Sequence, residues 1–523
     1  MVRFSRFVLM VVLACAATFA DRAPGAPPAR LTVHTRLLRD YETQHAKFAA
    51  QMETLAREVE GLGAANDAGA LRTLALQPEE RALQLMVLPD RPLPQVAADL
   101  PPMERNWRQR QRAIEADYAL ALYKLGNQAK VAGQVSLAWR FIREAAYRNP
   151  DLATARAALG FVLYENEWMT PFRKQMLTRG NVWSDQWGWV PAVDLPKYQQ
   201  GLRRAPNGAW QPADKVAAMR ANWADGWEVD SEHFHVKSNH SLERTVEISV
   251  ELERFYTYFV REFSAVFMTP QQVTNLLKGS GDVVSSKRHH VHYYRTQKEY
   301  QERLIKKQPE AAFSNGLYRP DDRIAHFFDR PGENEVVAET MYHEVTHQIL
   351  SESARKTVGL DNWVGGDFWL VEGLACYLES FKPQGRTGEV GDPQHPRIAW
   401  ARKFLAEDGF YVPLERFTGL TQLEYQCADM LNGPERIRRL QQHYSQAAGV
   451  THFFMHYGDG EYREALIEYL AQIYSADQQK RRNNATLDKL TGVPFAELDR
   501  QYQEYMRGLG EPTAPLQSAA DRR

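Results

Sequence analysis

Apolar side chains recur at alternating intervals of four and three near the start of the chain. They form one seam that comprises Tyr41, His45, Phe48, Met52, Leu55, Val59 and Leu62. Because residues three and four apart share one side of an α-helix, the seam predicts a long helix with a single buried face. It spans only three heptads, so we interpret it as a packing face within the chain and not as a coiled-coil dimer.

A second pattern repeats further along. Leu125-Gly126 recurs as Leu159-Gly160, 34 residues later (159 − 125), with small residues and Pro150 between them. This period resembles a tetratricopeptide repeat (TPR), in which small side chains let two antiparallel helices approach closely. We therefore expect TPR-like helices over residues 116–165. Fewer than three repeats are seldom stable alone, so this unit is expected to pack against its neighbours, as a spacer or as a groove for a protein partner.

Tryptophan is concentrated between residues 166 and 228, at Trp168, Trp183, Trp187, Trp189, Trp210, Trp223 and Trp227. Glu167-Trp168-Met169-Thr170-Pro171 is loosely echoed by Ala209-Trp210-Gln211-Pro212, which predicts two small connector modules. Aromatic clusters can bind sugars, but packing of a local core is their more common role.

A helix is expected from Glu335 to Leu350, because this run has no helix breaker and follows Asn334, a good N-cap. One face of that helix, suited to line a cleft, carries Val336, Thr340, His343, His347 and Leu350.

This helix carries the most informative motif, His343-Glu344-Val345-Thr346-His347. Two histidines one turn apart can bind one metal ion, and the carboxylate between them can deprotonate a metal-bound water. Glu372, 25 positions after His347 (372 − 347), offers a third ligand. Three ligands with one open position are typical of catalytic zinc, so we predict a Zn²⁺ site in a metallopeptidase. The alternative is a pair of core histidines on an ordinary helix.

The segment around Glu372 is also expected to be helical. One side of it is an apolar stripe of Leu370, Val371, Leu374, Ala375 and Leu378. Glu372, Cys376 and Glu379 share another side. Glu379 is either a surface carboxylate or a group that orients a zinc-bound imidazole through its second nitrogen. We interpret Cys376 as a small buried residue rather than a ligand.

At these positions a resemblance becomes specific. The HExxH motif followed by W-x-x-E-G-x-A-x-Y-x-E, at residues 369–379, resembles the gluzincin zinc metallopeptidases, which include the aminopeptidase N and thermolysin families. It is more similar to the peptidase-MA-like domains of bacterial secreted proteins. The resemblance covers residues 229–508 and implies an α+β fold with a small mixed sheet, the HExxH helix and a C-terminal helical subdomain. By the same resemblance, strands are expected at 233–238, 291–295 and 323–328, and a long helix at 242–263.

One departure from that resemblance bears on specificity. The aminopeptidases carry an upstream Gly-x-Met-Glu-Asn element whose carboxylate holds the free amino terminus of the substrate. The corresponding stretch here, Gly316-Leu317-Tyr318-Arg319-Pro320, has no carboxylate. We therefore expect an endopeptidase.

The resemblance also implies roles for single residues. Glu344 would act as the general base that accepts a proton from the zinc-bound water. A tyrosine or histidine well downstream of the third ligand would stabilise the oxyanion. We favour Tyr444, 72 positions after Glu372 (444 − 372), with His443 and Tyr425 as alternatives.

Other histidine pairs could compete for a metal ion. His290 and His292 alternate on an expected strand, and His452 and His456 lie one helical turn apart. Neither pair brings an adjacent acid and a third ligand, so ordinary packed or exposed histidines are the simpler interpretation.

Composition narrows the function classes. The 523 residues are 44% hydrophobic and 25% charged, enough for two or three domains. The 64 basic and 65 acidic residues give a net charge of −1, and no long basic stretch occurs, so nucleic acid is not an expected partner. The expected partner is a peptide or protein substrate.

The amino terminus resembles an export signal over residues 1–20. Arg3 and Arg6 precede a short apolar run, and Thr18-Phe19-Ala20 offers a cleavage site. The run is too short for a membrane span, so we expect an exported protein in the periplasm, the cell envelope or the medium. Lipid anchoring at Cys15 is a less favoured alternative, because Leu13 is unusual in a lipoprotein motif.

The expected order is a helical region at 21–115, the TPR-like helices, a Trp-rich connector at 166–228, the metallopeptidase domain and a disordered tail at 509–523. A different class of function, an envelope scaffold that binds through the TPR-like region and retains an inert peptidase fold, is the alternative. The acid at Glu344 favours the enzyme, because an inert descendant has no need of it.

Overall fold

The computed structural model of the chain describes residues 29–78, 87–267, 275, 288–312, 314–353, 366–385, 387–430, 433–475 and 484–510. The predicted signal peptide with Cys15, and all but the first two residues of the predicted tail, lie outside these ranges. In the described part of the chain no helix has the length and apolar character needed to cross a membrane.

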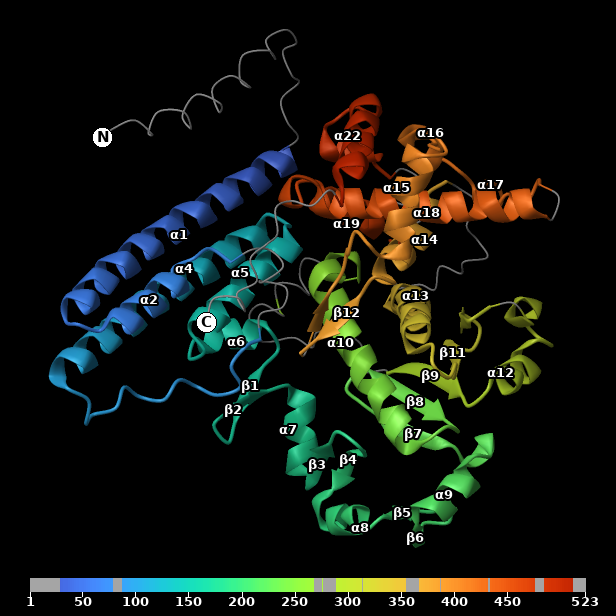
Figure 1. Ribbon diagram of the computed structural model, residues 1–523, viewed down its shortest axis with the longest axis horizontal. Helices are drawn as coiled ribbons and strands as arrows, with labels where there is room; N and C mark the ends of the chain where they lie inside the picture. The colour runs from blue at the N-terminus through green and yellow to red at the C-terminus, as the bar shows by residue number, and fades with distance from the viewer. Residues whose placement is uncertain are drawn as a thin grey trace, which may run out of the picture.

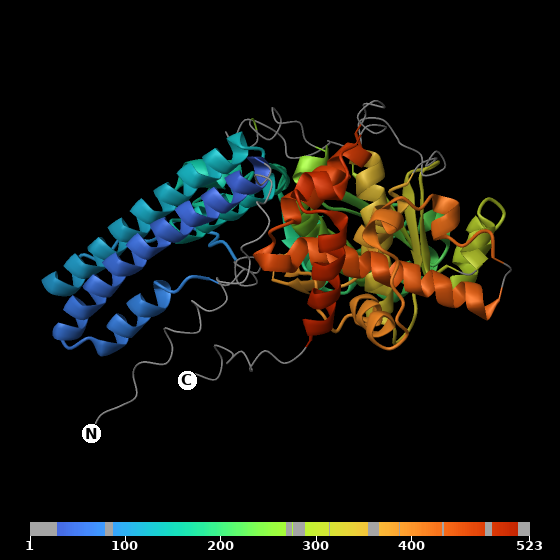
Figure 2. The same ribbon diagram turned by 90° about the horizontal axis from the view of Figure 1, so that it is seen from above.

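A bundle of helices forms the N-terminal part and projects to one side of the molecule (Figures 1 and 2). Its helices are α1 (Ala29–Gly61), α2 (Ala65–Leu74), α4 (Pro102–Val131), α5 (Val135–Arg148) and α6 (Ala153–Ala158). The predicted seam of α1 is buried from Tyr41 to Val59. Leu62 lies beyond the end of α1 and is 46% exposed, so the buried face ends with the helix.

The predicted close helix pair is α4 and α5. A Cβ atom on Gly126 of α4 would lie 2.5 Å from Cγ1 of Ile142 in α5, so only glycine permits this approach. The expected boundary between residues 115 and 116 falls inside α4. One core joins the two regions, in which Tyr41 donates a hydrogen bond of 2.9 Å to Glu144. The helix after Pro150, α6, has only six residues.

The Trp-rich segment folds into three hairpin–helix units, not the two modules expected. Their hairpins are β1–β2 (Val162–Tyr164, Glu167–Met169), β3–β4 (Asn181–Ser184, Gly188–Pro191) and β5–β6 (Leu202–Arg204, Trp210–Pro212). Their helices are α7 (Pro171–Thr178), α8 (Leu195–Gln199, after η1, Ala192–Asp194) and α9 (Ala213–Arg220). Two of the units also share a backbone hydrogen bond at the same place. The backbone N–H of Ala192 donates to the carbonyl oxygen of Gly180, and that of Ala213 donates to the carbonyl oxygen of Gly201, both at 2.9 Å.

A five-stranded mixed sheet lies at the centre of the C-terminal half, in the order β10-β11-β9-β8-β7. The strands are β7 (Trp227–Asp230), β8 (Phe234–Ser238), β9 (His289–Tyr294), β10 (Gly316–Arg319) and β11 (Ile324–Phe328). β9 is parallel to both β8 and β11, whereas β7 and β10 are antiparallel edge strands. The predicted strands are present, and β7, whose first two residues fall in the predicted connector, completes the sheet.

Helices pack against this sheet and against one another to form the largest core. Two of them, α10 (Leu242–Phe267) and α13 (Asn334–Ser353), share this core with the sheet, whereas α12 (Gln297–Leu304) packs on β9 and β11 in a separate small core. The other C-terminal elements are η3 (Pro309–Ala312), α14 (Phe368–Leu378), β12 (Lys382–Gln384), β13 (Thr387–Glu389), α15 (Pro396–Ala406), α16 (Leu414–Thr418), α17 (Gln422–Tyr425), α18 (Pro434–His456), η5 (Tyr457–Asp459), α19 (Arg463–Ile473), α21 (Leu487–Thr491) and α22 (Phe495–Gly508). The short η2 (Trp223–Asp225) precedes β7.

The bundle packs directly on the C-terminal half through α5 and α10. At this contact the buried Trp139 donates a hydrogen bond of 3.0 Å from Nε1 to Ser264 Oγ. Ala265 of α10 also packs against the core of the bundle. Ser136 of α5 also donates a hydrogen bond to Glu464 of α19. The two halves are thus joined both by direct contacts of α5 and along the chain by the hairpin–helix units.

Candidate metal centre

Helix α13 presents the HExxH motif beside the edge of the sheet. It packs against β10 and β11, and a Cβ atom on Gly316 of β10 would lie 2.8 Å from Cγ2 of Thr340. This close approach brings the edge strand within reach of the helix. The backbone N–H of Tyr318 donates a hydrogen bond of 2.8 Å to Oε2 of Glu344.

Helix α14 brings Glu372 to the same place. Every residue of this helix except Glu372 is buried, so the predicted apolar stripe is part of a wider buried surface. A Cβ atom on Gly373 would lie 2.9 Å from the carbonyl oxygen of Ala447, so glycine is needed for the close packing of α14 on α18. Asp367 begins the helix with a φ of 75° and accepts hydrogen bonds from Tyr469 and Asn484.

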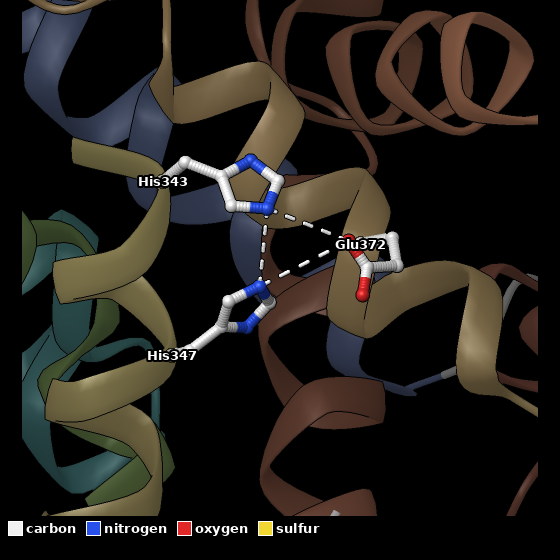
Figure 3. A group of neighbouring side chains, drawn as sticks. All are labelled: His343, His347 and Glu372. Carbon is white, nitrogen blue, oxygen red and sulfur yellow. Dashed lines mark hydrogen bonds and ion pairs between the residues drawn. The ribbon is translucent and has the colours of Figure 1, made fainter. Parts of the chain in front are cut away.

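The three predicted ligands converge, as Figure 3 shows. Nε2 of His343 lies 3.2 Å from Nε2 of His347. Oε2 of Glu372 lies 3.5 Å from the first of these nitrogens and 3.9 Å from the second. Tetrahedral zinc with bonds of about 2.0–2.1 Å requires ligand atoms about 3.3–3.5 Å apart. Two imidazoles and a carboxylate at these separations therefore fit one zinc ion.

Glu379 occupies the orienting position behind His343. Its Oε1 accepts a hydrogen bond of 2.8 Å from Nδ1 of His343. Arg397 of α15 donates two further bonds to this carboxylate, at 2.8 and 3.2 Å. Burial would raise the pKa of Glu379, but the bond with His343 and the charge of Arg397 lower it to about 2. An ionised acceptor keeps the proton of His343 on Nδ1 and leaves Nε2 free to bind a metal ion.

The two histidines differ in their electrostatics. Burial lowers the pKa of His347 to about 4, which keeps its ring neutral. Burial also acts to lower the pKa of His343, but hydrogen bonds to its neighbours raise that pKa well above the usual value. These neighbours include two carboxylates, Glu372 and Glu379, so without a metal ion the cluster stabilises a proton on His343. A divalent cation satisfies the same negative environment.

Glu344 lies beside the three predicted ligands but is not one of the converging group. Burial raises its pKa to about 7, although the charge of His343 and the backbone N–H of Tyr318 act in the opposite direction. A carboxylate with a pKa near neutrality can both accept and return a proton, which is the property a general base requires.

The three candidates for the oxyanion donor lie in different surroundings. Tyr444 is half-buried on α18, and burial and the charge of Glu372 raise its pKa, so its hydroxyl stays protonated. His443 is buried, with Nδ1 2.8 Å from the carbonyl oxygen of Tyr425. Tyr425 is fully buried, and its hydroxyl has no hydrogen-bond partner among the described residues. Of the three, only Tyr444 combines an accessible side chain with proximity to the ligands.

Cys376 is buried next to the ligands, as predicted. Its sulfur and ligand atoms of His343 and Glu379 lie within 4.8 Å of one another. Burial raises the pKa of this thiol, which disfavours the thiolate form that binds metal ions.

The other histidine pairs form no comparable group in the described ranges, where each set of three or more clustered ligands includes His343. His292 packs beside His326 and Trp223. His452 is hydrogen-bonded to Gly391 O and Tyr505, and His456 to Tyr377.

Three contributors to the site are not apparent from the sequence: Arg397, which holds Glu379; the backbone of Tyr318, which holds Glu344; and Asp367, which begins α14. No local spacing links Arg397 to the motif, because α15 is placed by the tertiary fold. The chain matches no protein-family model and no curated protein.

Proposed function

We propose that the protein is an exported zinc-dependent metallopeptidase, and specifically an endopeptidase. The observation that carries this proposal is the convergence of His343, His347 and Glu372 at zinc-ligand spacing, with Glu344 beside them. A scaffold would have no use for an acid between the two histidines.

Zinc, when bound, would polarise the carbonyl of the scissile bond and make the attacking water more acidic. Glu344 would take the proton of that water and deliver it to the nitrogen of the leaving amine. The Tyr318 N–H holds the carboxylate in place for both transfers. Tyr444 would donate a hydrogen bond to the oxygen that gains negative charge.

The edge strand β10 supplies a way to hold the substrate. It pairs on one side with β11, and among the described residues no strand pairs with its other side. An extended peptide can add to such an edge through backbone hydrogen bonds. Binding through the backbone in mid-chain, without a carboxylate at 316–320 for a free amino terminus, supports an endopeptidase.

Two measurements on the full chain test the proposal. One equivalent of zinc is expected by elemental analysis, and Glu344→Gln is expected to retain it because Glu344 is not a ligand. The same variant should lose hydrolysis of a broad peptide library, since an amide cannot accept the proton. The matched control is Glu335→Gln, an exposed acid on the same helix, which should keep full activity. A wild type that binds no zinc, or that is as inactive as Glu344→Gln, would favour the scaffold.

A further inference from the structure

The first turn of α15 packs against the helix that carries the HExxH motif. Pro396 is the first residue of α15 and Arg397 the second, after the buried N-cap His395. Nε2 of His395 lies 3.4 Å from Oε1 of Glu339, which precedes His343 by one turn of α13. The start of α15, and with it the backbone of Arg397, is therefore placed beside the candidate metal centre.

The same helix is also held against α18, which carries Tyr444. The two helices pack on each other, and a Cβ atom on Gly449 of α18 would lie 2.9 Å from Cβ of Ala401 in α15. Only glycine at this position permits so close an approach. Arg397 and Tyr444 therefore extend from two helices whose separation is fixed by packing.

The guanidinium of Arg397 contacts two parts of the site. It donates hydrogen bonds of 2.8 and 3.2 Å to the carboxylate of Glu379, which is bonded to Nδ1 of His343. Its central carbon also lies 5.9 Å from the centre of the Tyr444 ring. A cation within about 6 Å of an aromatic ring is attracted to the face of that ring. One side chain thus connects the group that orients His343 with the ring of the favoured oxyanion donor.

The ring of Tyr444 borders open space, so contacts of this kind decide where it points. Tyr444 is half-buried, and together with Arg397 it lines a groove of about 440 Å³. The ring of the fully buried Tyr425 supports it from the core, with 5.2 Å between the ring centres. A side chain beside open space has more than one staggered rotamer available unless a specific contact favours one of them.

The charge of Arg397 also acts on the hydroxyl of Tyr444. Burial and the charge of Glu372 raise the pKa of Tyr444, and the charge of Arg397 acts in the opposite direction. A nearby cation strengthens a hydroxyl as a donor to an oxygen that gains negative charge. A donor that is already in place needs no reorganisation during the reaction.

We propose that Arg397 is a positioning residue that holds Tyr444 in place relative to His343, because it contacts the Tyr444 ring while it is bonded to Glu379. This inference rests on the proposed function, since it takes Tyr444 as the oxyanion donor. It adds that the donor and the metal ligands are not placed independently. A change at Arg397 affects turnover through Tyr444 and zinc affinity through Glu379.

A double-mutant cycle on protein saturated with zinc tests the link to Tyr444. Arg397→Met removes the charge and is expected to lower kcat by about 10- to 100-fold, with little change in KM. The same substitution in the Tyr444→Phe background should have only a small further effect, because the hydroxyl that Arg397 positions is already absent. Losses in kcat that multiply would overturn the proposal.

Two further variants complete the cycle. Arg397→Lys keeps a positive charge beside Glu379, so it provides a folded protein even if Arg397→Met is unstable. It should show the same non-additivity with Tyr444→Phe, because an ammonium group cannot reproduce the paired bond of a guanidinium. Lys403→Met is the matched control, since Lys403 is on α15 but its side chain is 53% exposed and pairs with Glu407. Its kcat should equal that of the wild type.

Measurements without turnover separate this inference from the proposed function. A competitive chelator titration should show that Arg397→Met binds zinc about 10-fold more weakly, whereas Tyr444→Phe and Lys403→Met bind it as tightly as the wild type. The affinity of a phosphonate peptide, whose tetrahedral anion resembles the reaction intermediate, then gives the same cycle in the zinc-loaded Glu344→Gln protein.

The outcomes of these measurements are distinct. Non-additive losses in the free energy of phosphonate binding support the inference even if no peptide is cleaved. Additive losses overturn it, and so does a zinc-loaded protein that does not bind the phosphonate. A wild type that binds no zinc contradicts the proposed function, and the inference with it.

Discussion

After the three predicted ligands and Glu344, Tyr444 is the residue that we expect to matter most for turnover, because its hydroxyl is the favoured oxyanion donor. Tyr444→Phe keeps the ring, which packs 5.2 Å from the ring of Tyr425, and removes only the donor. Loss of one oxyanion donor typically lowers kcat by ~10²–10³ with little effect on substrate binding. Steady-state kinetics on a peptide cleaved by the wild type would measure this.

Tyr425→Phe is the matched control for this substitution. The hydroxyl of Tyr425 is buried without a hydrogen-bond partner in the described part of the chain, so its removal should leave kcat near normal and stability unchanged or higher. The opposite result, a large loss in Tyr425→Phe and none in Tyr444→Phe, would assign the donor role to Tyr425.

His292 links the stability of the sheet to pH. Burial lowers its pKa to about 3, and the nearby His326 and Lys237 act in the same direction. Below pH 6.5 the unfolded chain gains a proton at this position that the folded chain does not take up until about pH 3. The contribution of His292 to the stability of the folded state is therefore complete above pH 6.5. It is lost as the pH falls from 6.5 towards 3.

The substitution His292→Gln should flatten this dependence. The free energy of unfolding, from urea titrations at pH 7 and pH 5, is expected to fall less steeply in the variant, by up to about 1.4 kcal/mol per pH unit. Identical slopes in the two proteins would show that His292 titrates normally in the folded state.

At this scale the sequence predicted which side chains converge, because their spacing is local. His343 and His347 are one turn apart, and Glu372, Cys376 and Glu379 follow from helical geometry once α14 is recognised. Arg397 and Tyr318 were not predictable, because their roles depend on how separate elements come together.

The close packing of helix α14 on helix α18 depends on one residue, Gly373. Gly373→Ala would place a methyl group 2.9 Å from the carbonyl oxygen of Ala447, and forcing a backbone apart in this way costs about 1–3 kcal/mol. Since Glu372 is the neighbouring residue, we also expect weaker zinc binding. Thermal unfolding and a competitive zinc titration would measure the two effects.

Gly69→Ala is the control for Gly373→Ala. Gly69 is also in a helix, α2, but nothing lies within 4 Å of its added Cβ atom. This change should raise stability by up to about 1 kcal/mol through helix propensity. If both substitutions were equally harmless, the tight packing of α14 on α18 would not be needed for the zinc site.

Among the elements, α1 follows from apolar spacing and α13 from its capping residue and the absence of helix breakers. The strands β8, β9 and β11 and the helix α10 follow from the sequence resemblance. The edge strand β7 was not predicted, because Trp227 falls in the Trp-rich segment. The middle hairpin unit was missed although Trp168, Trp189 and Trp210 recur every 21 residues (189 − 168 and 210 − 189), because Trp183 and Trp187 obscure the period.

In the whole molecule the bundle and the C-terminal half are expected to unfold together. The buried Trp139 lies at their contact and bonds to Ser264, so neither half is complete without the other. Scanning calorimetry of the full chain should show one transition. Trp139→Ala, a loss of about 3–5 kcal/mol for a buried large ring, should split it into two.

Trp400→Ala provides the comparison, since Trp400 is 46% exposed on α15. A single transition at nearly the same temperature is expected for this variant. Two separate transitions in the wild type would mean that the halves fold independently. The sequence predicted both halves, but it could not predict their contact, because the faces of α5 and α10 that meet resemble any other apolar helix surface.

The double connection between the halves has a mechanical consequence. If a force pulled the bundle away from the sheet, the contact of α5 with α10 would bear the load first, and the hairpin–helix units would carry no tension. Once that contact broke, each 21-residue unit could unfold in turn and extend to about 70 Å. The connector would then behave as an extensible tether with discrete steps, which keeps a dislodged bundle attached and able to dock again.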